Sequence, residues 1–514
     1  MGSNGRPPGS RKPRTRHKGA AKQPSVPSAQ RSPASHFAES EPMQVRTHGV
    51  YPGHLHPKMD RTASLAKRGQ VWVNMVAFRY PARLTMMIFL LLIAITTSGL
   101  LLPISRAPGM PASVVDAFFT AVSAVCVTGL TVVDTATHWS WFGQFVILTG
   151  ITLGGLGVMT MASLLALVVS RRLGLTSRLL SAQDTRGRLS DAGTLVIGVL
   201  VTTAVAETLL FLILLPSFIA GGHATADALW SALFTAVSAF NNAGFVNLPE
   251  GLAPYIGSWG VLLPVTLAAF VGGIGFPVIT DLRRSWLAPR RLSLHTKLTL
   301  TTYLSVAVVS ALAVLALEWN NPETFGALNG SEKTLNTLLG MVNPRSLGVS
   351  AVPVSEMTGA SWLITDLSMF IGGGSGSHAG GVKVTTFAVL LLAAWAEARG
   401  RTDIDAFHRR IPHETLRQAI AVLLAAAMLV LSVTLILLVV TPFSLERILF
   451  EVTSAFGTVG LSTGITPYMP PAAKLLIAFL MVAGRVGPMT LAAALALRQQ
   501  TRLIRMPEER PIVG

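Results

Sequence analysis

The sequence predicts an all-α polytopic membrane protein with four fused helix–pore loop–helix repeats, and so eight transmembrane helices around one pore. Three observations predict this fold class. First, the 514 residues are 51% hydrophobic and only 13% charged, whereas a soluble protein carries about a quarter charged residues. Second, eight apolar segments approach the roughly 20 residues that a bilayer span requires. Third, a short glycine-containing motif recurs four times between them.

The chain begins with a basic segment that differs from the rest. Residues 1–70 contain 13 Lys and Arg but 3 Asp and Glu, and they are rich in Pro, Ser and Gly. This composition predicts a disordered tail over residues 1–75. We expect the tail to lie in the cytoplasm near anionic membrane lipid rather than to bind nucleic acid. No apolar core follows the first basic residues, so no signal peptide is expected.

Eight apolar segments follow, and their flanking charges set their orientation. Basic residues gather in alternate connections, which marks the cytoplasmic side, so both termini are expected in the cytoplasm and the chain in the cell (plasma) membrane. The spans are 83–103, 142–170, 193–218, 258–282, 297–318, 361–397 (interrupted), 415–440 and 473–497. The basic connections contain Arg171, Arg172, Arg178, Arg186 and Arg188, then Arg283, Arg284, Arg290 and Arg291, then Arg399, Arg401, Arg409 and Arg410, with Arg498, Arg502 and Arg505 at the end.

A short half-apolar stretch that ends in glycine follows each odd-numbered span. The four copies read FFTAVSAVCVTGLT (118–131), LFTAVSAFNNAGFV (233–246), LLGMVNPRSLGVS (338–350) and LFEVTSAFGTVGLS (449–462). Such a period indicates an internal repeat. It divides the chain into the tail (1–75), repeats at 76–175, 176–290, 291–400 and 401–500, and a cytoplasmic C-terminal tail (501–514).

Each repeat predicts a re-entrant loop at membrane depth. Non-helical backbone is tolerated there only where protein or a water-filled cavity surrounds it. Four such loops about one axis could replace the hydration shell of a cation with backbone carbonyls. The fourth loop contains Thr458, Val459 and Gly460, as in the first three residues of the potassium filter motif TVGYG, but Leu461 stands where that motif has Tyr.

Four segments resemble the Ktr/Trk/HKT superfamily of potassium transporters, over about residues 78–500. They are NNAGF (241–245), IGGGSGSHAGGVKVTT (371–386), SAFGTVGLSTG (454–464) and GRVGPMT (484–490). No extra hydrophobic pair precedes residue 83, so the chain looks most like a Ktr-type (KtrB-type) membrane subunit. The resemblance implies a homodimer, a cytosolic nucleotide-binding regulatory subunit (KtrA/TrkA-like) and no organic cofactor in this chain.

The resemblance also implies an ion-binding site. It places a selectivity filter for K⁺, with Na⁺ as an additional activator, on four loops whose glycines favour potassium over sodium. Leu347 departs from the family, which often has a small residue there. The filter residues are Val127, Thr128 and Gly129, then Asn242, Ala243 and Gly244, then Ser346, Leu347 and Gly348, then Thr458, Val459 and Gly460.

The sixth span is broken by the segment FIGGGSGSHAGGVKVTT (370–386), which predicts a gate at 371–383. Lys383 and Arg485 lie within apolar spans, where charged residues are functional candidates. We expect Arg485 to face the pore beneath the filter and both residues to belong to the gate, with Lys383 nearer the cytoplasmic half of its broken helix. The alternative for Lys383 is that its long side chain snorkels to the interface. The loop residues of the predicted gate are Gly372, Gly373, Gly374, Ser375, Gly376, Gly380 and Gly381.

Four other residues carry weaker expectations. His378 is either an ordinary polar loop residue or a pH sensor. Asp366 is expected to be wet at the outer end of its helix, and Glu207 to pair with a basic residue or to assist a proton step. Pro277 is expected to kink its helix, as is Pro488 in the last span.

Three other function classes fit the sequence less well. A nucleotide-binding loop needs Gly and Lys adjacent, but Val382 separates Gly381 from Lys383. A Na⁺-coupled or Na⁺-selective secondary transporter with inverted repeats remains the alternative, although all four repeats start and end on the same side. No nucleophile–base set or metal-ligand cluster stands out, so the chain is not expected to be an enzyme.

Overall fold

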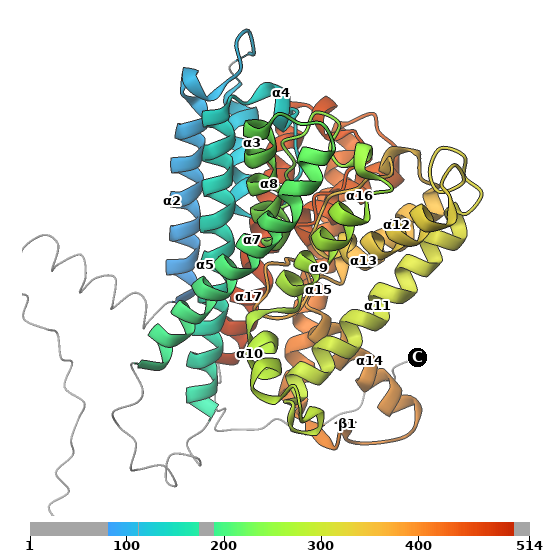
Figure 1. Cartoon of the computed structure of the whole chain (residues 1–514). Coiled ribbons are helices and arrows are strands. Elements are labelled where there is room, and N and C mark those ends of the chain that lie inside the picture. Colours follow the sequence, from blue (N-terminus) through green and yellow to red (C-terminus); the bar gives the residue numbers. More distant parts are fainter. Residues whose placement is uncertain (1–80, 112, 174–189, 498–514) are drawn as a thin grey trace, which may run out of the picture. The chain divides into compact units, whose positions relative to one another are not determined.

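The computed structural model describes residues 81–111, 113–173 and 190–497 (Figure 1). Two units divide the chain, residues 1–63 and 64–514, and every described residue belongs to the second. The predicted basic tail, much of the first basic connection and the C-terminal tail lie outside the described residues. Their expected structure and orientation stay predictions.

The described residues form four successive blocks, each with a long helix, a shorter helix, a loop and a further long or broken helix. The first block contains α2 (Pro81–Leu101), α3 (Val114–Val125), the one-turn α4 (Thr135–His138) and α5 (Trp141–Leu173). The second block contains α7 (Ser190–Ala220), α8 (Thr225–Phe240), α9 (Trp259–Ile274) and α10 (Phe276–Ser285). The 3-10 turns of these blocks are η1 (Pro103–Ser105), η2 (Ala253–Tyr255) and η3 (Pro289–Arg291).

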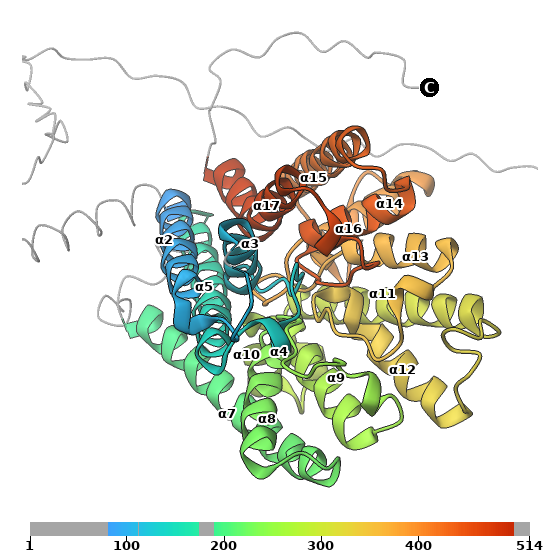
Figure 2. The same ribbon diagram turned by 90° about the horizontal axis from the view of Figure 1, so that it is seen from above.

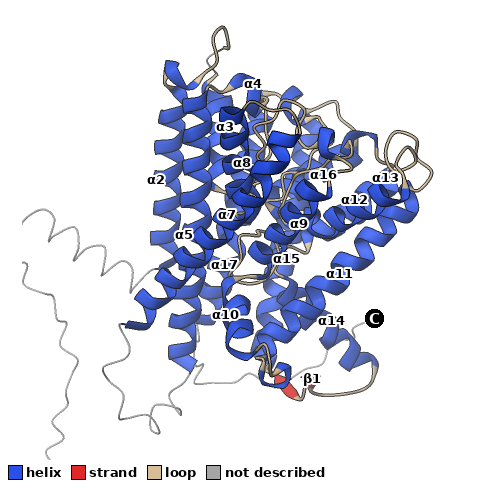
Figure 3. Ribbon diagram, in the orientation of Figure 1, coloured by secondary structure: helices blue, strands red, loops and turns tan. Residues whose placement is uncertain are grey.

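The third and fourth blocks repeat this order. The third contains α11 (Leu294–Glu318), α12 (Gly330–Val342), α13 (Gly359–Phe370) and α14 (Val384–Ala398), with the turns η4 (Asn343–Arg345) and η5 (Val354–Glu356). The fourth contains α15 (His413–Val440), α16 (Leu445–Gly457), the turn η6 (Thr466–Tyr468) and α17 (Pro471–Leu497). Between them β1 (Ile404–Ala406) pairs with β2 (Arg409–Ile411) in an antiparallel hairpin, which contains the only strands of the described residues (Figure 3).

Several of the expected spans satisfy the length and composition of a membrane helix. Among the described residues four helical segments qualify, namely Val196–Ala220, Leu294–Glu318, His413–Val440 and Pro471–Pro488, and a fifth if α9 and α10 are counted as one bent span. The other three expected spans coincide with α2, with α5 and with the pair α13 and α14. The chain is therefore a multi-pass helical protein, while the count of eight spans stays a prediction.

The bend in the fourth expected span lies at a glycine. α9 and α10 meet at 96°, and the residue between them, Gly275, has φ +98°. A Cβ at Gly275 would lie 2.7 Å from the carbonyl oxygen of Ser375, so this close approach requires glycine. Pro277 lies in the first turn of α10, where proline is tolerated. The expected Pro277 kink is thus a break two residues earlier, whereas Pro488 lies inside the continuous helix α17.

Two of the shorter helices begin at residues that cap them. The Asn329 side chain accepts a hydrogen bond from the Glu332 amide, and the Glu332 carboxylate accepts one from the Asn329 amide, both at 3.0 Å. Ser113 caps α3 by accepting from the Asp116 amide at 3.2 Å. Such caps satisfy amide groups that have no partner within the helix, and they fix where each short helix starts.

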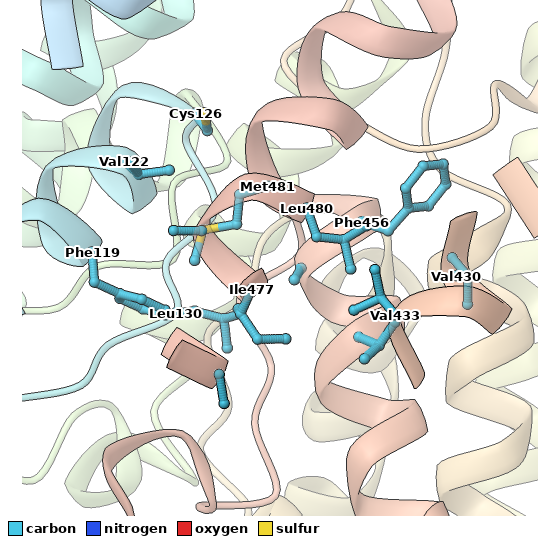
Figure 4. Close-up of a cluster of buried hydrophobic side chains, with 14 of the residues drawn as sticks. Phe119, Val122, Cys126, Leu130, Val430, Val433, Phe456, Ile477, Leu480 and Met481 are labelled. Atoms are coloured by element: carbon cyan, nitrogen blue, oxygen red, sulfur yellow. The ribbon is translucent and has the colours of Figure 1, made fainter. Parts of the chain in front are cut away.

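The four blocks close on one another. α5 contacts α7 and α8, α9 contacts α12, α13 contacts α16, and α17 contacts α2, α3 and α5. Seen from above, the blocks follow one another around a common centre in chain order (Figure 2). An apolar cluster joins the last block to the first, with Phe119 and Leu130 beside Ile477 (Figure 4). In contrast, large apolar side chains such as Leu91 and Leu431 are exposed, as expected for surfaces that face lipid.

Candidate functional site

Four loops with one backbone conformation form the centre of the site. Each has a positive φ at its glycine, from +70° to +96°, and again at the residue two positions earlier. These pairs are Val127 and Gly129, Asn242 and Gly244, Ser346 and Gly348, and Thr458 and Gly460. Only six non-glycine residues of the described part have positive φ, and four of them are in these loops. Since such conformations are strained and often mark functional sites, the repeated loop is the strongest candidate.

The serine that the motif shares in three of its four copies helps to hold those loops in place. The carbonyl oxygens of Ser123, Ser238 and Ser454 each accept a hydrogen bond, at 2.8 Å, from the amide five residues later. In the first and fourth loops the serine hydroxyl also accepts from the glycine amide at 3.1 Å. The matching TAVSA, TAVSA and VTSA segments therefore have a structural role in fixing the loop.

The third loop lacks this serine and is held differently. The Leu347 amide donates to the carbonyl oxygen of Asn343 at 3.2 Å. The Leu347 side chain is fully buried in an apolar cluster with Leu339 and Val342. The departure at Leu347 therefore leaves the backbone conformation of this loop like that of the other three.

The four glycines form a closed ring of contacts. A Cβ added to Gly129 would lie 2.5 Å from the Ala243 carbonyl oxygen, and one added to Gly244 would lie 3.0 Å from the Leu347 carbonyl oxygen. A Cβ on Gly348 would meet the Val459 carbonyl oxygen, and one on Gly460 would meet that of Thr128. Each glycine thus faces the loop of the next block, and the fourth faces the first. All twelve predicted filter residues belong to these loops.

Several side chains of the loops are buried in apolar clusters, while the contacts between neighbouring loops are made by backbone groups. Val127 and Ala243 belong to one apolar cluster, and Val459 belongs to another. The hydroxyl of Ser346 donates to the Thr458 carbonyl oxygen and so links the third loop to the fourth. This arrangement can present carbonyl oxygens to a cation, which suits an ion that exchanges its hydration shell for protein oxygens.

The broken sixth span lies against these loops. The segment 371–383 separates α13 from α14, and its ends meet where the Gly372 amide donates to the Val382 carbonyl oxygen at 2.8 Å. The Gly374 amide donates to the Gly273 carbonyl oxygen at 2.9 Å, and the Phe276 amide donates to the Gly376 carbonyl oxygen at 3.1 Å. The predicted gate residues are therefore brought together and bonded to the second block.

Arg485 and His378 connect the same segment to the other blocks. The Arg485 guanidinium is buried and donates to the His378 carbonyl oxygen. The His378 ring contacts Phe240 at 5.6 Å between centroids, and a Cβ on Gly155 of α5 would lie 3.4 Å from it. The segment thus contacts α5, α8, α9 and α17. His378 is a fully buried residue of this segment, and its role as a pH sensor stays a prediction.

Lys383 differs from the expectation. Its ammonium group donates to the carbonyl oxygens of Ala379 and Gly380, at 2.5 and 3.5 Å. Lys383 therefore folds back onto its own loop, which disagrees with the alternative that it snorkels to the interface, while its role in the gate stays a prediction. Neither Lys383 nor Arg485 forms an ion pair with a carboxylate among the described residues.

Sequence reasoning gave Arg345 no role in the site. It is fully buried, and it donates to the Ile371 carbonyl oxygen at 3.0 Å and to the Ser368 hydroxyl at 3.1 Å. Its guanidinium lies 5.1 Å from the centre of the Tyr303 ring. Arg345 thereby ties the third loop to the start of the broken segment. An arginine within a half-apolar repeat was the signal that could have found it.

Three carboxylates also lie near the loops. Glu451, which sequence reasoning missed, accepts from the Ser462 hydroxyl at 2.6 Å and from the Thr463 amide at 2.8 Å, and so holds the chain that follows the fourth loop. Glu207 accepts from the Asn241 amide group at 2.7 Å. Asp366 is buried, with 6% of its surface exposed, so the expectation that it is wet is wrong.

Comparison with known proteins decides the family. The TrkH family, described as "Cation transport protein", matches residues 63–504. The chain belongs to the TrkH family. Its members are transporters, which confirms both the resemblance and the expectation that the chain is not an enzyme.

Several relatives and one solved structure are similar to this TrkH-family chain. The Ktr system potassium uptake protein B of Bacillus subtilis is 37% identical over 83% of this chain and 95% of its own length. The protein of the same name from Vibrio alginolyticus is 33% identical over 81% and 91%. The potassium/sodium uptake protein NtpJ of Enterococcus hirae is 33% identical over 84% and 97%. The crystal structure of the potassium transporter TrkH from Vibrio parahaemolyticus shares the fold, with a TM-score of 0.61 at 18% identity over 80% and 84%.

Proposed function

We propose that this chain moves K⁺ into the cell, down its electrochemical gradient, through a selectivity filter formed by the four loops. The ring of contacts among Gly129, Gly244, Gly348 and Gly460 carries this proposal, because it gathers backbone carbonyls from all four blocks at one centre. Four similar backbone segments suit a cation that must lose its hydration water, because their carbonyl oxygens can replace that water without a fixed charge. The names of the relatives from Bacillus and Vibrio, both potassium uptake proteins, support the choice of ion.

The broken segment at 371–383 is the proposed gate. It contacts α5, α8, α9 and α17 next to the loops, and Gly380 lies so close to Thr458 that a Cβ would collide with the threonine hydroxyl. A segment in that position obstructs an ion path unless it moves. The Arg485 cation beside it adds an electrostatic barrier.

The remaining parts of the proposal follow the relatives' membership of a Ktr system. We place both termini in the cytoplasm, with two copies of the chain in the assembly and a cytosolic nucleotide-binding subunit as the regulator. Na⁺ would act as an activator rather than as the transported ion. The alternative, a Na⁺-selective or Na⁺-coupled transporter, is favoured only by the name of the potassium/sodium uptake relative from Enterococcus hirae.

Ion flux through reconstituted protein tests the filter. We expect liposomes containing the chain to take up K⁺ in preference to Na⁺, and expression to rescue a strain that lacks potassium uptake. Gly129→Ser and Gly460→Ser should lower the preference for K⁺ because both side chains enter the ring. Unaltered selectivity in both variants, each folded, would contradict the filter assignment. Uptake of Na⁺ alone by the unaltered chain would favour the alternative.

Removal of the segment tests the gate. Replacing residues 372–381 by a short linker should raise K⁺ flux, because the obstruction is lost while the four loops stay. Selectivity should be retained, and that readout separates the gate from the filter. Unchanged or abolished flux in a folded deletion would refute the gate.

A further inference from the structure

A groove rich in arginine lies away from the four loops. We call it the basic groove, and define it by Arg290, Arg291 and Lys297 on one wall and Phe407, Arg409 and Arg410 on the other. Its volume is about 1180 Å³. The first wall comes from the turn before α11 and the second from the tip of the β1–β2 hairpin, which lies beside the start of α11 at the lower edge of Figure 1.

Packing fixes both walls of the groove. The inward residues of the hairpin, Ile404, Ala406 and Ile411, are buried in an apolar cluster that includes Leu298 of α11. Arg409 and Arg410, at the tip end of β2, are both exposed. On the other wall, the Lys297 ammonium donates to the Arg290 carbonyl oxygen at 3.1 Å. The cations are therefore held on a preformed surface.

The positive charge of the groove is largely unpaired. Arg410 forms an ion pair with Asp403 at 2.6 Å, but Arg290, Arg291 and Arg409 form none with the described residues. The nearby carboxylate of Asp281 accepts from the Ser293 amide at 2.9 Å and from the Thr296 hydroxyl at 2.6 Å. Guanidinium groups match phosphate oxygens in geometry as well as charge, so the groove suits a phosphate.

Exposed apolar side chains precede the groove in the same turn, and one more lines its opposite wall. Trp286 and Leu287 lie four residues before Arg290 and Arg291, respectively, and expose 71% and 80% of their surfaces. Phe407 on the opposite wall exposes 44%. Tryptophan is enriched where the membrane meets water. A soluble phosphate has no apolar part that could contact these side chains, whereas a lipid has acyl chains beside its headgroup.

We propose that the basic groove binds the phosphate headgroup of an anionic phospholipid, with Trp286 and Leu287 in contact with its acyl chains. Basic residues near a membrane surface are attracted to anionic lipids, and here the arginines face one another across a fixed gap. The bound lipid would link the α10–α11 turn to the hairpin.

Lipid titration of the purified full-length chain in detergent tests this proposal. Phosphatidylglycerol and phosphatidylcholine with the same acyl chains are compared by native mass spectrometry. We expect phosphatidylglycerol to bind in preference, and Arg290→Gln/Arg409→Gln to weaken it roughly 30-fold. The control Arg399→Gln/Arg401→Gln makes the same charge change outside the groove and should shift binding by less than about threefold. Equal affinities of the groove variant and the unaltered chain would overturn the proposal.

Two further arms separate a lipid from a free phosphate and from damage to the fold. Trp286→Ser/Leu287→Ser should weaken phosphatidylglycerol binding but leave soluble glycerol 1-phosphate unaffected. If glycerol 1-phosphate binds as tightly as the lipid and this variant changes neither, the groove binds free phosphate and the proposal fails. Both arginines are exposed, so the lipid-free thermal midpoint should be unchanged. If the thermal midpoint of the double variant falls, the single variant Arg290→Gln replaces it in the test. We then expect phosphatidylglycerol binding to weaken roughly fivefold, and an unchanged affinity would overturn the proposal.

Discussion

At the scale of single residues, two glycines four positions apart differ in what surrounds them. Gly460 and Gly464 have φ of +96° and +86°. A Cβ on Gly464 would meet nothing within 4 Å, whereas one on Gly460 would meet the Thr128 carbonyl oxygen and the Gly129 Cα at 3.1 Å. Replacing each of these two glycines by alanine therefore separates the cost of backbone strain, which both variants share, from the cost of crowding in the ring, which only Gly460 has.

Gly464→Ala should cost about 1–2 kcal/mol of stability, which is the price of a left-handed alanine. Gly460→Ala should lower the thermal midpoint of the purified protein well beyond Gly464→Ala, and it should reduce both K⁺ uptake and its preference over Na⁺, because the methyl group displaces the backbone of the first loop. Thermal unfolding and uptake in liposomes check both effects. Similar behaviour of the two variants would show that the ring is looser than its contacts indicate.

The residues of the candidate site could be predicted only in part. Its glycines could be located because four copies of one motif align on them. The left-handed conformations of Val127, Ser346 and Thr458 could not, because Val, Ser and Thr seldom adopt positive φ, whereas Asn, the type at position 242, does so more often. Arg345 was missed because its partners are carbonyl and hydroxyl groups, which have no signature in the sequence.

At the scale of elements, a buried carboxylate sets where α13 starts. Glu318, at the end of α11, is fully buried and accepts from the Thr358 amide and hydroxyl at 2.9 and 2.8 Å and from the Ser361 hydroxyl at 2.5 Å. Its other oxygen accepts from Asn321 at 2.6 Å and Thr324 at 2.7 Å. One side chain thus anchors the helix that leads into the broken segment.

Glu318→Gln should destabilise the protein by about 3 kcal/mol, because hydrogen bonds to a charged acceptor are strong and the new amide would face donors. Glu323→Gln is the matched control, since Glu323 is exposed on the neighbouring turn, and it should change stability by less than about 0.5 kcal/mol. Thermal unfolding of both variants in the same detergent measures the difference. A Glu318→Gln midpoint equal to that of the control would contradict this role.

The sequence predicted the positions of the long helices better than the points at which helices are interrupted. Long apolar runs place α7, α11 and α15 within a few residues, because a bilayer span dictates their length. The 96° turn at Gly275 could not be predicted, since it depends on the approach of Ser375 from another block. Pro277 looked like the cause because proline is the usual cause of kinks.

At the scale of the whole described unit, closure depends on contacts between the first and last blocks. Lys474 of α17 forms an ion pair with Asp116 of α3 at 2.9 Å, and their side chains expose only 12% and 20% of their surfaces. Hydropathy alone could not predict which blocks would meet, because it gives the spans without their neighbours.

A double-mutant cycle with Asp116→Asn and Lys474→Met should give a coupling free energy of about 1 kcal/mol, because the pair is largely shielded from water. The control is the cycle Asp403→Asn and Arg410→Met, whose pair is exposed by 42% and 61% and should couple by less than about 0.3 kcal/mol. The thermal midpoints of the unaltered chain and of the single and double variants are measured for both cycles. Equal coupling in the two would mean that the Asp116–Lys474 pair adds nothing to closure.

Because a single chain supplies all four blocks, the blocks need not be equal. Only the third has its second long helix interrupted by a glycine-rich segment, and that segment already touches α5, α8, α9 and α17. A tetramer of identical chains would bring four such segments to the same place, where they would exclude one another. Having all four blocks in one chain therefore permits one asymmetric segment at the centre of the ring, which a homotetramer could not accommodate.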